Sequence, residues 1–129
     1  CITYDVVDGS GTYRGGIISP GLRMRARAMH AYSARLPEVV PSADAPLLGR
    51  STESSLASGV YHGIRAELVG LVEETAYQHP GLAVVLTGGD APLFLSALKS
   101  GIFADPLLTL RGLHALLQHH TRGRGPVAP

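Results

Sequence analysis

The chain has 129 residues, of which 45% are hydrophobic and 16% are charged, a composition that fits one globular domain and excludes disorder for most of the chain. Eleven basic and ten acidic residues give a formal net charge of +1, so no strong basic field indicates a nucleic acid or a membrane surface as partner. One cysteine excludes an internal disulfide, and every apolar run is far shorter than the ~20 residues of a membrane span. We expect no secretory signal and a cytoplasmic location.

The first part of the chain predicts a β-hairpin. Residues 3–7 and 12–18 have strand-forming sequences, and the cluster 8–11 between them is typical of a turn. Gly15 and Gly16 in the second strand predict a bulge or the close approach of another backbone. Because the chain starts at Cys1 directly before a strand, we expect it to be part of a longer protein.

A first helix is predicted from Pro20 to about Ser33, with Pro20 at its first position. Leu22, Met29 and Tyr32 would share its apolar face, while the arginines at 23, 25 and 27 would point elsewhere. Three prolines, at 37, 41 and 46, then predict an irregular loop.

The longest helix is predicted to begin after Ser51 as N-cap, with Glu53 favourably placed near the positive end of the helix dipole. Apolar residues recur every three or four positions and predict a buried stripe: Leu56, Val60, Ile64, Leu68 and Leu71. A second row consists of small residues and favours close packing: Ser55, Gly59, Gly63 and Gly70.

The last third predicts a strand over 82–86 that is buried on both faces, a glycine turn, and a helix over 91–98. A final helix is predicted over 110–120 with its leucines inward: Leu113, Leu116 and Leu117. We expect a folded domain over residues 1–120 and a disordered tail over 121–129.

Two segments have the chemistry of binding sites. Thr87-Gly88-Gly89-Asp90 follows a strand and precedes a predicted helix, an arrangement that suits a phosphate but also an ordinary tight turn. The hydroxyl residues of Leu48–Glu53 at the start of the long helix suit either a helix cap or a polar ligand. The histidines lack metal-ligand spacing and Cys1 lacks a neighbouring base, so we expect no metal site and no cysteine nucleophile.

Six segments of the chain occur in an order and at a spacing that are specific as a set: Cys1–Asp5, Gly15–Gly21, Ala34–Pro37, Gly49–Thr52, Ser58–Tyr61 and Leu86–Asp90. As a set they resemble the carboxyl-terminal half of the type III pantothenate kinases, nearly up to His120. The resemblance implies an α/β fold of the ribonuclease-H-like type, in the superfamily of acetate and sugar kinases, heat-shock ATPases and actin. Its mixed sheet would begin with a β-hairpin and be packed by helices, and residues 1–120 would form the second domain of the kinase.

The same resemblance implies ATP-dependent phosphorylation of pantothenate to 4'-phosphopantothenate, the first step of coenzyme A biosynthesis. It implies a homodimer, a monovalent cation (K⁺ or NH₄⁺) and Mg²⁺ with ATP, and no nucleic-acid or membrane partner. The alternative is a non-catalytic α/β ligand-binding module or an inactive kinase fragment.

Three residues match the family's binding residues. Thr52 matches the threonine that contacts pantothenate, and Gly88 and Gly89 match the glycine turn on the nucleotide side. Ile18 and Tyr32 lie in a segment that resembles the one used in dimer contact and in closing the partner's pantothenate pocket. The family's catalytic aspartate, cation-binding aspartate and first phosphate loop have no counterpart in this sequence. We therefore expect no catalytic or metal-binding residue in this chain, and no activity from the chain alone.

Overall fold

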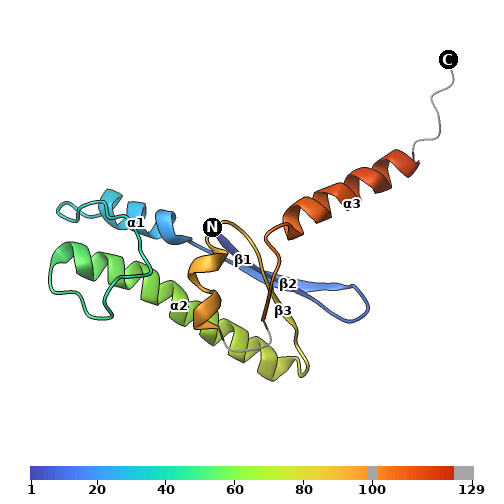
Figure 1. The fold of residues 1–129 in the computed structure, drawn as a ribbon, viewed down its shortest axis with the longest axis horizontal. Helices are drawn as coiled ribbons and strands as arrows, with labels where there is room; N and C mark the ends of the chain where they lie inside the picture. Colours follow the sequence, from blue (N-terminus) through green and yellow to red (C-terminus); the bar gives the residue numbers. More distant parts are fainter. Residues whose placement is uncertain (99–101, 124–129) are drawn as a thin grey trace, which may run out of the picture. The chain divides into compact units, whose positions relative to one another are not determined.

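The structure is a computed structural model that describes residues 1–98 and 102–123 (Figure 1). The chain divides into two compact units, Cys1–Leu68 and Val69–Pro129. The elements in chain order are β1 (Ile2–Val7), β2 (Tyr13–Ser19), α1 (Leu22–Ala31), α2 (Thr52–Gln78), β3 (Val84–Leu86), the 3-10 helices η1 (Ala91–Leu93) and η2 (Leu95–Ala97), β4 (Ile102–Ala104) and α3 (Leu108–Gly123). Within the described ranges, none of the helices combines the length and apolar character that crossing a bilayer requires.

β1 and β2 form the predicted antiparallel hairpin. The Asp8 carboxylate closes the turn by accepting hydrogen bonds from the backbone N–H groups of Ser10, at 2.9 Å, and Thr12, at 3.0 Å. Gly11 has a φ of 81°, a conformation that favours glycine. Local turn chemistry therefore determines where this hairpin reverses.

The bulge that the glycine pair predicts is present in β2. The strand register shifts between Val6 and Val7, next to Gly15, whose φ is 116°. A Cβ atom on Gly16 would overlap the carbonyl oxygen of Tyr4 on the paired strand. Both expectations for this pair, a bulge and a close backbone approach, are confirmed.

α1 begins later than predicted. Gly21 is its N-cap, so Pro20 lies before the helix and not at its first position. Leu22 and Ala26 are buried, but Tyr32 follows the last helical residue and is 92% exposed. The prediction that Tyr32 shares the apolar face is wrong, because the helix ends before it.

α2 is the long helix expected from its apolar period. Four residues of the predicted stripe are buried: Leu56, Val60, Ile64 and Leu68. Leu71 is half-buried. Of the helical glycines of the small row, Gly63 has a neighbour, since a Cβ there would lie 3.7 Å from Nη1 of Arg25, whereas a Cβ on Gly59 or Gly70 would meet nothing within 4 Å.

In the second unit β3 pairs in parallel with β4, a strand that the sequence did not predict. Val85 of β3 is 47% exposed, so the prediction of a strand buried on both faces is wrong: among the described residues β3 has one paired neighbour. The hairpin and the parallel pair form separate sheets within residues 1–98 and 102–123. The mixed α/β class is confirmed, whereas one mixed sheet is not formed by the described strands.

The helices of the second unit also differ from expectation. Residues 91–93 and 95–97 form two 3-10 turns instead of the one α-helix predicted over 91–98. α3 is longer than predicted, and the leucines expected to face inward are about 60% exposed: Leu113, Leu116 and Leu117. An apolar period marks a helix face but does not show that another element covers it. Of the predicted tail, residues 121–123 belong to α3 and 124–129 lie outside the described residues.

Candidate functional site

One carboxylate joins the strands and helices of the Cys1–Leu68 unit. Glu67 on α2 accepts hydrogen bonds at Oε1 from the Tyr4 hydroxyl, at 2.8 Å, and from the Ser19 hydroxyl, at 2.5 Å. Its Oε2 pairs with Nη2 of Arg25, whose Nε donates to the Pro20 carbonyl at 2.7 Å. We call Tyr4, Ser19, Arg25 and Glu67 the Glu67 cluster. It joins both strands of the hairpin and α1 to α2.

Partial burial alone would raise the pKa of Glu67, but the hydrogen bonds from Ser19, Arg25 and Tyr4 outweigh it and lower that pKa. Burial, reinforced by the hydrogen bond to Glu67, raises the pKa of Tyr4 well above its ordinary value. Both shifts favour one state of the cluster, an ionised Glu67 and a neutral Tyr4.

We expect acid to destabilise this unit through Glu67. Because its folded pKa lies below the ordinary 4.5, the stabilisation is complete above about pH 4.5 and is lost as the pH falls through the lower folded pKa. For Tyr4 the folded pKa lies above 10.0, so its contribution is present below pH 10.0 and is lost as the pH rises towards the folded value. Denaturant midpoints measured from about pH 3 to about pH 7 should fall on the acid side, and less steeply in Glu67→Gln. An equal fall in both proteins would contradict this assignment.

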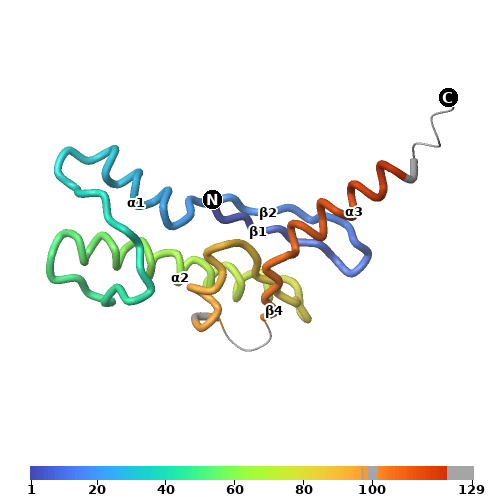
Figure 2. Tube along the Cα trace, turned by 45° about the horizontal axis from the view of Figure 1, so that its top comes forward, coloured from blue at the N-terminus to red at the C-terminus, as the bar shows by residue number. Residues whose placement is uncertain are grey.

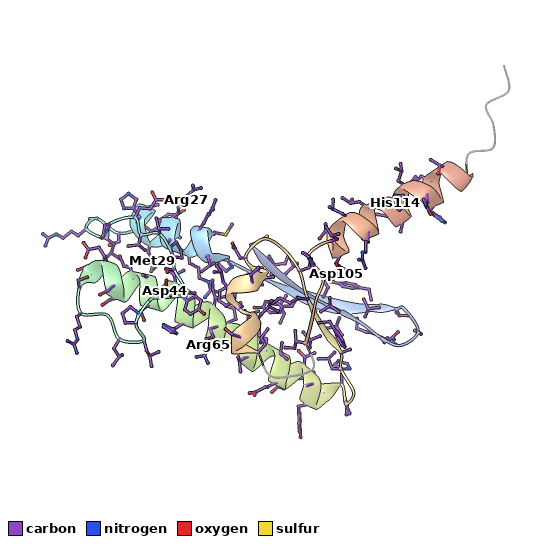
Figure 3. All side chains as sticks on the ribbon, in the orientation of Figure 1. Arg27, Met29, Asp44, Arg65, Asp105 and His114 are labelled. Carbon is purple, nitrogen blue, oxygen red and sulfur yellow. The ribbon has the colours of Figure 1, made fainter. Side chains whose placement is uncertain are left out.

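A pocket of about 670 Å³ lies in the same unit, between α1, the loop that precedes α2, and the first turns of α2. Its lining consists of Met29, Leu36, Gly49, Arg50, Ser51, Thr52, Ser55, Leu56 and Gly59. In Figure 3 Met29 lies on the side of α1 towards α2, whereas Arg27 lies on the opposite side. Met29, Leu36 and Leu56 are the buried or half-buried apolar part of this lining. The segment Gly49–Thr52, which we call the rim, carries the exposed side chains of Arg50, Ser51 and Thr52. Such a lining suits a small ligand that is both apolar and polar.

Ser51, and not Thr52, caps α2. The Ser51 Oγ accepts a hydrogen bond from the backbone N–H of Ser54 at 3.2 Å. Ser54 Oγ in return accepts from the backbone N–H groups of Arg50 and Ser51, each at 2.9 Å. Thr52 is exposed, and its hydroxyl has no hydrogen-bond partner among the residues that the structure describes. The cap is therefore supplied without Thr52, which leaves its hydroxyl available to a ligand.

The glycine turn belongs to the second unit and is described within it. Gly88 has a φ of 100°, and its carbonyl accepts from the backbone N–H of Ala91 at 3.2 Å. The adjacent Thr87 Oγ1 is buried and has no hydrogen-bond partner in the described part of the chain. The turn is confirmed, and Gly88 and Gly89 as nucleotide-binding residues stay a prediction.

Comparisons with known proteins decide the family. The sequence model for type III pantothenate kinases matches residues 1–74. The chain belongs to the type III pantothenate kinase family. The type III pantothenate kinase of Phocaeicola vulgatus is 42% identical over 122 residues, which are 95% of this chain and 50% of the relative. That of Bacteroides fragilis is 45% identical over 120 residues, 93% of this chain and 49% of the relative. The chain thus spans about half the length of the curated relatives it matches.

A solved structure is similar as well. The crystal structure of a conserved Campylobacter jejuni protein, named for the Baf family of transcriptional activators, matches with a TM-score of 0.59 and 25% identity. The match covers 93% of this chain and 54% of that chain. The chain therefore has a fold similar to that of a solved protein.

The pocket is lined by residues that the sequence analysis did not assign to a binding site. Met29 and Leu36 come from α1 and the loop after it, and Arg50 lies beside Thr52. The signal for Arg50 was its place within the Gly49–Thr52 segment. Ile18 and Tyr32 are 79% and 92% exposed, and their part in a dimer stays a prediction.

In the part of the chain that the structure describes, no group of three or more His, Cys, Asp or Glu side chains is placed to hold a metal ion.

Proposed function

We propose that this chain supplies the pantothenate-side wall of a kinase that transfers the γ-phosphate of ATP to pantothenate, giving 4'-phosphopantothenate. The observation that supports this most directly is the Thr52 hydroxyl, which lines the pocket while Ser51 caps the helix. Pantothenate carries amide, hydroxyl and carboxylate groups, and a threonine hydroxyl both donates and accepts.

Arg50 is a suitable partner for the negatively charged carboxylate of pantothenate. Its guanidinium lines the pocket and has no ion-pair partner among the described residues. A planar guanidinium binds a carboxylate through two parallel hydrogen bonds. We therefore assign the carboxylate end of pantothenate to Arg50 and an adjacent polar group to Thr52.

The reaction step needs residues outside this chain. In the proposed enzyme an aspartate from another part of the protein accepts the proton of the pantothenate hydroxyl, and the oxygen attacks the γ-phosphorus in line. Gly88 and Gly89 would offer bare backbone on the nucleotide side, with the buried Thr87 hydroxyl beside them. A ribonuclease-H-like domain over residues 1–120, a homodimer and a cytoplasmic location belong to the same proposal.

We expect the 129-residue chain alone to show no pantothenate-dependent ATP turnover, because positioning and charge stabilisation supply most of phosphoryl transfer. A coupled assay with pantothenate, Mg²⁺ and K⁺ tests this. Turnover by the chain alone would contradict the proposal that the base lies elsewhere. A non-catalytic ligand-binding module remains the second candidate, and it predicts that pantothenate binds without any turnover even when the other half of a relative is supplied.

Thr52→Ala should weaken pantothenate binding by ~1–3 kcal/mol, roughly tenfold or more, because the substitution leaves a polar group of the ligand without a partner. Thr52→Ser keeps the hydroxyl and should recover most of the affinity. The Michaelis constants of both variants can be measured in a chimera in which this chain replaces the matching residues of the Bacteroides fragilis kinase.

The control for Thr52→Ala is the constant for ATP, which should change much less. Ser51→Ala provides a second control, since loss of the cap should lower the melting temperature by removing about 1 kcal/mol of stability. A Thr52→Ala protein with an unchanged pantothenate constant would exclude Thr52 from the site.

A further inference from the structure

The loop between α1 and α2 runs back along α2 before it enters that helix (Figure 2). Two side chains of α2 hold it there. Ser58 Oγ donates to the Leu47 carbonyl at 2.7 Å, and Nε2 of His62 lies 2.9 Å from the Ala45 carbonyl oxygen. Ser58 and His62 are one helical turn apart, on one face of α2, and their partners are two residues apart in the loop. We call this pair of hydrogen bonds the Ser58–His62 clamp.

The chemistry of the clamp is specific. A carbonyl oxygen only accepts, so Nε2 of His62 must carry the hydrogen. The other ring nitrogen, Nδ1, is buried without a hydrogen-bond partner in the described part of the chain. Ser58 is 7% exposed, and its hydroxyl donates out of the helix to the loop. Both side chains thus bond to the loop backbone.

The clamp lies immediately before the rim of the pocket. Leu47 is followed by Leu48 and then by Gly49, where a Cβ would overlap backbone atoms of Ser54 and Ser55. The Gly49 backbone is therefore in close contact with the first turn of α2. The next two N–H groups bond to Ser54 Oγ. The loop is therefore held against α2 on both sides of Leu48.

We propose that Ser58 and His62 are positioning residues of the pocket. They hold the rim Gly49–Thr52 so that the Arg50 guanidinium and the Thr52 hydroxyl occupy fixed places at the ligand. The identity of that ligand rests on the proposed function, whereas the action of the clamp on the rim does not.

A matched pair of substitutions at His62 tests the clamp in the 129-residue chain. The amide nitrogen of Gln stands near the place of Nε2 and reaches the Ala45 carbonyl, whereas that of Asn stands near Nδ1 and falls short. In His62→Asn, hydrogen exchange at the backbone amides of Arg50 and Ser51, followed by NMR, should be about threefold to tenfold faster, as loss of one side-chain hydrogen bond predicts. His62→Gln should restore the wild-type rates.

Ser58→Ala should act in the same direction as His62→Asn, because it removes the second donor of the clamp. Thr75→Val is the control: Thr75 also sits on α2, but its hydroxyl donates to the Leu71 carbonyl of its own helix at 2.6 Å. It should leave exchange at the rim unchanged.

Titration calorimetry with pantothenate, in the chimera with the Bacteroides fragilis kinase, then links the clamp to the ligand. His62→Asn should bind pantothenate about threefold to tenfold more weakly, and His62→Gln should bind as the wild type does. Unchanged exchange at Arg50 and Ser51 in His62→Asn would overturn the proposal. An equal acceleration at the β1 and β2 amides would overturn it too, because it would mean general destabilisation. If the chimera with the wild-type chain binds no pantothenate, the proposed function fails, and the exchange rates still decide whether the clamp positions the rim.

Discussion

Glu67→Ala should lower the free energy of unfolding by about 2–3 kcal/mol, since it removes the shared acceptor of the Glu67 cluster. The Tyr4 and Ser19 hydroxyls lose their acceptor, and the half-buried Arg25 guanidinium loses its ion-pair partner. Urea denaturation of the whole chain, followed by circular dichroism, measures the change.

Two controls separate the parts of this loss. Glu67→Gln keeps a carbonyl oxygen for Tyr4 and Ser19 but removes the charge that Arg25 pairs with, so it should lie between the wild type and Glu67→Ala. Glu74 is an exposed carboxylate of the same helix whose Oε1 accepts from Gln78 at 2.9 Å, and Glu74→Ala should change stability by a few tenths of a kcal/mol at most. A Glu67→Ala protein no less stable than Glu74→Ala would show that the cluster does not hold the unit together.

Among pocket residues, Gly49 is the one where a single added methyl group, as in Gly49→Ala, should destabilise the protein most. Its Cβ would overlap the carbonyl carbon of Ser54 and the backbone nitrogen of Ser55, and neither atom belongs to a flexible side chain. The loop or the first turn of α2 must then shift. We expect a loss of about 2–3 kcal/mol in the free energy of unfolding, as for overpacked sites. Pantothenate affinity should fall with it, because the shift displaces the pocket rim.

Gly70→Ala is the matched control for this substitution. Gly70 lies within α2, and a Cβ there would meet nothing within 4 Å. Because alanine is the better helix former, this variant should gain up to about 1 kcal/mol. Equal effects of the two substitutions on the urea midpoint would exclude the steric account of Gly49.

Features determined by neighbouring residues could be predicted from the sequence. The Ser51 cap depends on residues three positions apart, and the bulge at Gly15 depends on a backbone conformation that favours glycine. The apolar face of α2 follows from its period, and four of its five residues are buried. These predictions needed no knowledge of which distant segments meet.

The Glu67 cluster could not be predicted in this way. Glu67 lies 63 residues from Tyr4 and 48 from Ser19, and no local pattern brings them together. The helix period placed Arg25 away from the apolar face of α1, yet it is half-buried against Glu67 because an ion pair lets a charged group enter the interior. Polar contacts between distant elements depend on the tertiary arrangement.

Only part of the candidate site was predicted, because its other contacts also join distant parts of the chain. Thr52 came from the family resemblance, and the structure adds that the cap does not need its hydroxyl. Ser58 was noted only as part of the family segment Ser58–Tyr61, and His62 only among the histidines without metal-ligand spacing. Their partners at Ala45 and Leu47 lie in a loop with no regular pattern, so the clamp was not predicted.

The division between the two compact units falls between Leu68 and Val69, inside α2 and not in a linker. In a helix each carbonyl accepts from the N–H four positions later, so a protein ended at Leu68 would lose the donors for the last four carbonyls of that fragment. The Glu67 carboxylate would then stand beside a frayed end and a new terminal carboxylate of the same charge. Anyone expressing the amino-terminal unit by itself should therefore end it after Gln78, where the helix itself stops, and keep all of α2 in one piece.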